Sequence, residues 1–143
     1  MLRNLLTGIP VMFLCLVLQA VFVTTNLRYY ARFRQTHELR ESQWRDILVL
    51  SIVMLMMLFS NLAQMLIWAV LFVLLGEFTD LTTALYHSAV NFVTLGYGDI
   101  VMSERWRFLG PLEAVNGILM FGVSTAVITA AVLDVVKRRS DKL

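Results

Sequence analysis

The chain has 143 residues, of which 59% are hydrophobic and 15% are charged. A soluble domain usually carries about 25% charged residues, so this composition indicates a membrane protein. The net charge is only +2, and the basic residues cluster beside apolar stretches, which argues against a nucleic-acid-binding protein.

The first uncharged stretch, residues 4–27, is long enough for a transmembrane helix, which needs about 20 apolar residues. We assign residues 1–25 to this helix. A basic start and an apolar core also fit a cleaved signal peptide. Cleavage would leave an arginine-rich segment and the basic tail outside the cell, so a retained helix is preferred. Cys15 lies in this stretch, and a single cysteine makes neither an intrachain disulfide nor a metal site.

Residues 26–46 form the segment that follows, in which five arginines alternate with Tyr29, Tyr30, Phe33 and Trp44. Cations and aromatic rings both suit the lipid headgroup layer. The segment is either an amphipathic interfacial helix or a simple positive stop between two membrane anchors. The second interpretation is preferred, with the segment on the cytoplasmic side.

The second uncharged stretch lies between Asp46 and Glu77 and predicts a transmembrane helix over residues 47–76. This is longer than the hydrocarbon core requires, so the helix is expected to tilt or to project from the bilayer. Ser60, Asn61 and Gln64 are polar residues within it. We interpret them as hydrogen-bonding groups between helices.

A short apolar segment comes next, over residues 79–93. Thr79 or Asp80 can cap a helix there. Such a helix spans about 20 Å, which is too short to cross a bilayer. It is also too apolar to lie in water. We therefore predict a re-entrant helix, which is tolerated only inside protein or beside a water-filled cavity.

The glycine-containing loop "TLGYGD", residues 94–99, follows this short helix. Gly96 and Gly98 permit backbone angles that other residues avoid, so successive carbonyls can turn to one side. The negative end of the helix dipole favours a cation at this point. A dinucleotide-binding loop would need a third glycine where this chain has Val101, and Asp99 would repel phosphate.

The third uncharged stretch lies between Glu113 and Asp134 and predicts a helix over residues 111–136, with a basic tail at 137–143. Lysine and arginine mark the cytoplasmic side of a membrane protein. They are concentrated in 26–46 and in the tail. We therefore expect both segments to be cytoplasmic and the N-terminus to lie outside.

With these predicted helices and the TLGYGD loop, residues 47–136 resemble the potassium-channel pore domain. That family combines an outer helix, a pore helix, a T-V-G-Y-G-D filter and an inner helix, and "GILMFGVSTA", residues 117–126, is similar to its inner-helix pattern. The resemblance implies an all-α membrane protein with three transmembrane helices, a re-entrant pore helix and a filter between the second and third. It also implies a homotetramer, because one chain supplies one filter segment.

The resemblance further implies roles for individual residues. Potassium would bind at Thr94, Leu95, Gly96 and Tyr97, with Gly98 at the outer bend and the Tyr97 ring packed behind the filter. The mouth and its support would be Asp99, Tyr86, His87, Asn91 and Glu113. The inner helix would supply a hinge, Gly117, and a cavity stripe of Phe121, Thr125 and Thr129, although helix packing explains that spacing equally well.

Several positions depart from the family pattern. Leu95 replaces valine, and Tyr86 and His87 replace a frequent tryptophan pair. Val90 stands where some members have a glutamate, so Asp99 lacks that partner. His87 is expected to be a neutral hydrogen-bonding group. Glu113 either caps the first turn of its helix or reaches behind the filter.

The function these features predict is a passive, potassium-selective channel in the plasma membrane. Its partners would be three further copies of the chain and membrane lipids, and potassium ions would be its permeant ligand, with no cofactor. No nucleophile–base set indicates an enzyme. The alternatives are a weakly selective cation channel and a non-conducting membrane subunit that keeps the pore fold.

Overall fold

The computed structural model describes residues 1–36 and 43–140, and these ranges contain four helices and no strand. The helices are α1 (Leu2–Thr36), α2 (Gln43–Leu74), α3 (Leu81–Phe92) and α4 (Leu109–Ser140). α1, α2 and α4 are each long and apolar enough to cross a membrane. α3 has 12 residues; at 1.5 Å per residue it covers about 18 Å, well short of a bilayer. The chain is therefore an all-helical, multi-pass membrane protein.

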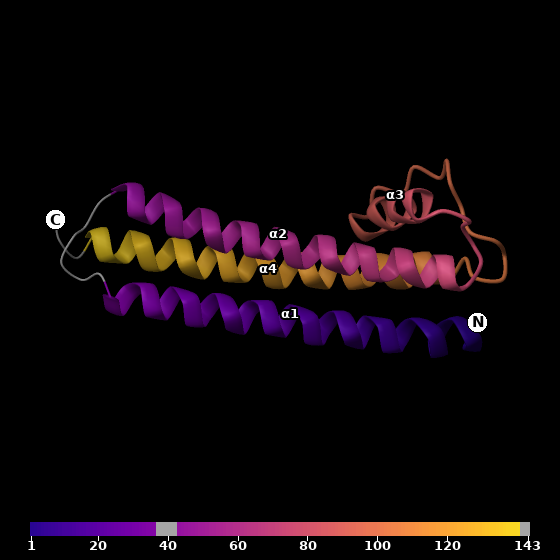
Figure 1. The fold of residues 1–143 in the computed structure, drawn as a ribbon, viewed down its shortest axis with the longest axis horizontal. Coiled ribbons are helices and arrows are strands. Elements are labelled where there is room, and N and C mark those ends of the chain that lie inside the picture. Colours follow the sequence, from indigo (N-terminus) through magenta and orange to yellow (C-terminus); the bar gives the residue numbers. More distant parts are fainter. Residues whose placement is uncertain (37–42, 141–143) are drawn as a thin grey trace.

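The three long helices run side by side as an extended bundle (Figure 1). α1 packs against both α2 and α4. α3 also packs against α2 and α4, at the end of the bundle where the N-terminus lies. The end of α2 and the start of α4 meet at this same end, because α3 and its flanking loops connect them.

The helix that differs most from the sequence expectation is α1. It continues through Thr36, whereas the sequence placed its end near residue 25. No glycine or proline occurs between residues 11 and 36, so nothing in the local chemistry stops the helix at the membrane surface. The first part of segment 26–46 is thus helical, while residues 37–42 lie outside the described part of the chain.

The other helix boundaries shift by smaller amounts. α2 begins at Gln43 instead of residue 47 and ends at Leu74 instead of residue 76. α3 covers 81–92 within the expected 79–93, and Asp80 caps it by accepting a bond from the Thr83 N–H at 2.8 Å. α4 begins at Leu109, which places Pro111 in its first turn. It extends to Ser140, into the predicted tail, whose residues 141–143 are not described.

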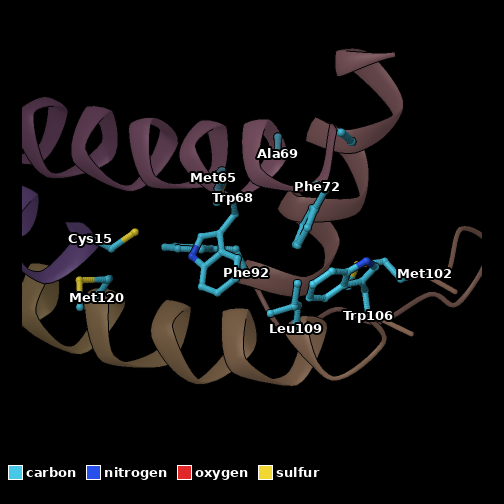
Figure 2. Close-up of a cluster of buried hydrophobic side chains, with 11 residues drawn as sticks. Cys15, Met65, Trp68, Ala69, Phe72, Phe92, Met102, Trp106, Leu109 and Met120 are labelled. Atoms are coloured by element: carbon cyan, nitrogen blue, oxygen red, sulfur yellow. The ribbon is translucent and has the colours of Figure 1, made fainter. Parts of the chain in front are cut away.

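The apolar core lies at the α3 end of the bundle and draws on all four helices (Figure 2). Its members are Cys15, Met65, Trp68, Ala69, Phe72, Ala84, Phe92, Met102, Trp106, Leu109 and Met120. Lipid tails are as apolar as this core, so close packing holds it together rather than transfer out of water. α1 approaches α4 through Gly8, where a Cβ would lie 2.7 Å from Cδ1 of Leu112.

A polar junction lies further along the bundle, where Gln19 of α1 meets residues of α2 and α4. Its Oε1 accepts hydrogen bonds from Ser60 at 2.6 Å and Gln64 at 2.8 Å, and its Nε2 donates to Ser124 of α4 at 3.1 Å. Asn61 also donates to the Ser124 hydroxyl, at 3.4 Å. The expectation that Ser60, Asn61 and Gln64 bond between helices is confirmed. Gln19 and Ser124, their partners, were not predicted.

Candidate functional site

The candidate site begins at the C-terminal end of α3, where the chain turns directly into residues 94–98, the predicted filter (the filter segment). The Thr94 N–H donates to the Asn91 carbonyl at 2.8 Å. The N–H groups of Leu95 and Gly96 both donate to the Val90 carbonyl, at 2.9 and 3.3 Å. Carbonyls that would be left unpaired at the end of α3 therefore anchor the first filter residues.

The filter segment has an alternating backbone conformation. Thr94, Gly96 and Gly98 have φ values of 59°, 61° and 73°, so every second residue is left-handed. Thr94 is the one non-glycine residue with positive φ in the described ranges, and a β-branched residue rarely adopts this conformation. When successive residues alternate between left- and right-handed backbone conformations, their N–H groups turn to one side of the chain and their carbonyls to the other. The glycine spacing predicted this conformation.

The side chains of the filter segment are not buried by their own chain. Tyr97 is 68% exposed and Leu95 is 52% exposed. Beside the segment lies a hollow of about 420 Å³ whose lining includes Gly96, Gly98, Asn91 and Pro111. The expected packing of the Tyr97 ring behind the filter therefore stays a prediction, because it needs a surface that this chain alone does not supply.

Asp99, at the end of the loop, has a partner on α3. The Tyr86 hydroxyl donates to its Oδ2 at 2.7 Å. This bond lowers the pKa of the Asp99 carboxyl and raises the pKa of Tyr86. Tyr86 thus supplies the contact that Val90 cannot, and it joins the outer end of the filter segment to α3.

His87 is held between two groups that fix its tautomer. Its Nδ1 lies 2.9 Å from the Ile100 carbonyl, which can only accept, so Nδ1 carries the hydrogen. Its Nε2 is then free to accept from the Asn91 amide at 2.8 Å. Burial lowers the pKa of His87, which also favours the neutral ring. The geometry agrees with the neutral role expected from the sequence.

α4 closes against the end of α3 at Gly117. A Cβ built there would lie 1.9 Å from the carbonyl oxygen of Phe92. One turn further along α4, the Phe121 ring meets the Phe92 ring edge-on, with centroids 5.7 Å apart. Thr125 and Thr129 continue along α4 and are exposed in the single chain. Their exposure is compatible with lining a cavity and with contacting another copy of the chain.

Comparison with known families shows that residues 56–134 fit the family model described as "Ion channel". The match covers more than half of the 143 residues and includes α3, the filter segment and most of α2 and α4. The chain belongs to this ion channel family. No curated protein matches the chain, and no solved structure matches it.

Within this ion channel, Glu113 joins α4 to α3. It is fully buried on α4, and its Oε1 lies 2.5 Å from the hydroxyl of Ser88 on α3. The same hydroxyl lies 2.8 Å from the Met65 carbonyl on α2. The Ser88 hydroxyl has one hydrogen and can donate it to Met65 or to Glu113, but not to both. Both contacts are hydrogen bonds only if Glu113 is protonated and donates to the Ser88 oxygen. The contact of Glu113 with α3 leaves both of its predicted roles, capping and support behind the filter, as predictions.

We predict that Glu113→Gln conducts like the wild-type channel, whereas Glu113→Ala conducts poorly. Glutamine has nearly the same shape and keeps a hydrogen-bond donor and an acceptor next to Ser88. Alanine leaves the buried hydroxyl without this partner, at a cost of about 1–3 kcal/mol per chain. Ion flux into liposomes and the melting temperature of the purified protein measure the two effects. Wild-type flux in both variants would exclude a supporting role for Glu113.

Sequence reasoning missed the polar residues that surround Glu113. Ser88 was not identified on α3, and Asn116 of α4 is fully buried with neither amide atom hydrogen-bonded in the described structure. The signal was present in the sequence as polar residues inside apolar stretches. The partners of Ser88 lie on α2 and α4, so the sequence alone did not show that these residues meet.

Proposed function

We propose that this ion channel is a passive, potassium-selective channel whose ion path is the backbone of residues 94–98. Thr94, Leu95, Gly96 and Tyr97 would coordinate dehydrated potassium ions through their carbonyl oxygens. Gly98 would form the outer bend, and Asp99, Tyr86, His87, Asn91 and Glu113 would hold the filter in shape.

The observation that carries the proposal is the alternating backbone at Thr94, Gly96 and Gly98 directly after the end of α3. Potassium filters replace the hydration shell of the ion with backbone carbonyls. The three positive φ values are spaced as such a column of carbonyls requires. The partly negative C-terminal end of α3 adds an electrostatic preference for a cation.

A column of carbonyls from one chain surrounds only part of an ion, so we propose that four copies assemble around a shared axis. The exposure of Leu95 and Tyr97 supports this assembly, since both are large apolar side chains left uncovered at the filter. The hollow beside the filter offers room for a side chain of another copy. In the tetramer, Gly117 would be the hinge of the inner helix, and Phe121, Thr125 and Thr129 would lie toward the cavity below the filter.

The proposed orientation in the plasma membrane puts α3 and the filter mouth near the outside, with α3 re-entrant. The N-terminus would then also be outside, because it lies at the α3 end of the bundle. The other end carries the basic residues Lys137 and Arg138, as expected for the cytoplasmic side. The packing of α1 along α2 and α4 supports a helix retained in the membrane.

Reconstitution of the purified protein in liposomes tests this function. Potassium flux, a reversal potential that follows the potassium gradient in mixed potassium and sodium, and a mass of four chains for the complex are the expected results. Equal permeability to both ions would indicate a weakly selective cation channel. Absence of any flux from a correctly assembled tetramer would indicate a non-conducting subunit.

A further inference from the structure

The helix α1 lies wholly outside the part of the chain that matches the ion channel family, since that match begins at residue 56. Nevertheless three of its five buried residues within 2–32 are polar. These five residues are Asn4, Gly8, Cys15, Gln19 and Asn26. They recur at intervals of four or seven residues, which places them on one helix face. A face of this kind is a site of specific bonding to other helices rather than of contact with lipid.

We propose that α1 positions α4 and thereby sets how often the channel is open. This inference rests on the proposed function, namely that four copies assemble around an axis and that α4 lines the ion path. Two contacts carry it: a cluster at the C-terminal end of α1, formed by Tyr30, Asp134 and Arg138, and the junction of Gln19 with Ser124. Tyr30 and Gln19 are positioning residues, since they act through α4 and touch no ion.

The cluster joins one residue of α1 to two residues of α4. The Tyr30 hydroxyl donates to Oδ2 of Asp134 at 2.6 Å and accepts from Nη2 of Arg138 at 2.8 Å. Arg138 also forms an ion pair with Asp134 at 3.1 Å. The hydroxyl is therefore held by an anion and a cation together, and hydrogen bonds to charged groups are stronger than those between neutral groups.

The direction of the effect follows from where α1 lies. α1 packs on α2 and α4, and α3 packs on the same two helices without contacting α1. Because α1 has no contact with α3, we place it at the periphery of each subunit in the proposed tetramer. Its bonds to Ser124 and Asp134 draw the second half of α4 toward the periphery. They oppose movement of α4 toward the axis, which would narrow the pore.

Single-channel recording of Tyr30→Phe tests the proposal. The variant keeps the aromatic ring and loses only the hydroxyl. We expect the ratio of open to closed time to fall about tenfold, the size of one hydrogen bond to a charged group. Conductance and the reversal potential should stay unchanged, because the filter is not altered. Asp134→Asn should lower the ratio too, and the double variant should be no worse than the more affected single variant.

Thr24→Val is the matched control, because it also removes a hydroxyl from α1. The Thr24 hydroxyl donates to the Val21 carbonyl of its own helix, so its loss should leave gating unchanged. Gln19→Leu removes the second contact, the bond to Ser124, and should also lower the ratio of open to closed time. An unchanged or increased open time in Tyr30→Phe, or additive effects in the double variant, would overturn the proposal.

A distance measurement tests the positioning without relying on ion flux. Spin labels at Leu27 of α1 and Val136 of α4, both more than half exposed, are introduced in a Cys15→Ala background. Labelled chains are diluted with unlabelled chains so that only distances within one chain are measured. Tyr30→Phe should lengthen or broaden the α1–α4 distance. If the wild-type protein carries no flux, the proposed function fails, and an unaltered distance would separately refute the role of α1.

Discussion

Gly117→Ala should abolish ion flux and destabilise the protein, because α4 and the end of α3 leave no room for a side chain between them. The added Cβ would lie 1.9 Å from the Phe92 carbonyl oxygen and 2.8 Å from its carbonyl carbon. Both are backbone atoms, so no rotamer change relieves the overlap. Either α4 withdraws from α3 or the Phe92 peptide shifts, and Thr94 begins the filter two residues later. Overpacking of this kind costs about 1–3 kcal/mol per chain or more.

Gly122→Ala is the matched control on the same helix. A Cβ at Gly122 meets nothing within 4 Å, and alanine favours a helix over glycine by about 1 kcal/mol. This variant should therefore keep its thermal stability and its flux. Melting temperature, the mass of the complex and liposome flux distinguish the two substitutions. If Gly117→Ala proved as stable and conductive as Gly122→Ala, the close approach of α4 to Phe92 would be wrong.

Gly96→Ala is expected to abolish potassium conduction while leaving the assembled complex intact. A Cβ at Gly96 meets no atom of its own chain within 4 Å, so the expected cost is backbone strain at a φ of 61° rather than a clash. That strain is about 1–2 kcal/mol for each chain. Four chains would carry it around one ion path. Relaxation toward negative φ would turn a carbonyl away from the path, whereas the contacts among the long helices would remain.

Gly76→Ala is the matched control, because it introduces the same backbone strain outside the filter segment. Gly76 has a φ of 75° and also has nothing within 4 Å of its added Cβ, but it lies in the turn after α2. This variant should lose some stability and keep selective flux. Tyr97→Asp, which removes the ring and adds charge, should lose selectivity before conduction. Potassium and sodium flux, measured in the same liposomes, distinguishes these three variants. Normal selective flux through Gly96→Ala would exclude residues 94–98 as the ion path.

The sequence by itself determined the features that depend on neighbouring residues. Uncharged stretches identify the three long helices, because the length needed to cross a membrane is a property of a continuous segment. Asp80 caps α3 through the Thr83 N–H, three residues away, so that signal is local as well. The spacing of Gly96 and Gly98 predicts the alternating backbone, since positive φ is a preference of the glycine residue itself.

The tertiary structure decided which helix faces meet, and with them the partners of the polar groups. Glu113 bonds to Ser88, Asp99 to Tyr86, and Gln19 to residues of two other helices. Gly117 was predicted as a hinge, and the structure adds a close contact with Phe92. Each of these pairs except Tyr86 and Asp99 joins residues at least 25 positions apart. Such contacts depend on the packing and rotation of whole helices, which no short stretch of sequence specifies.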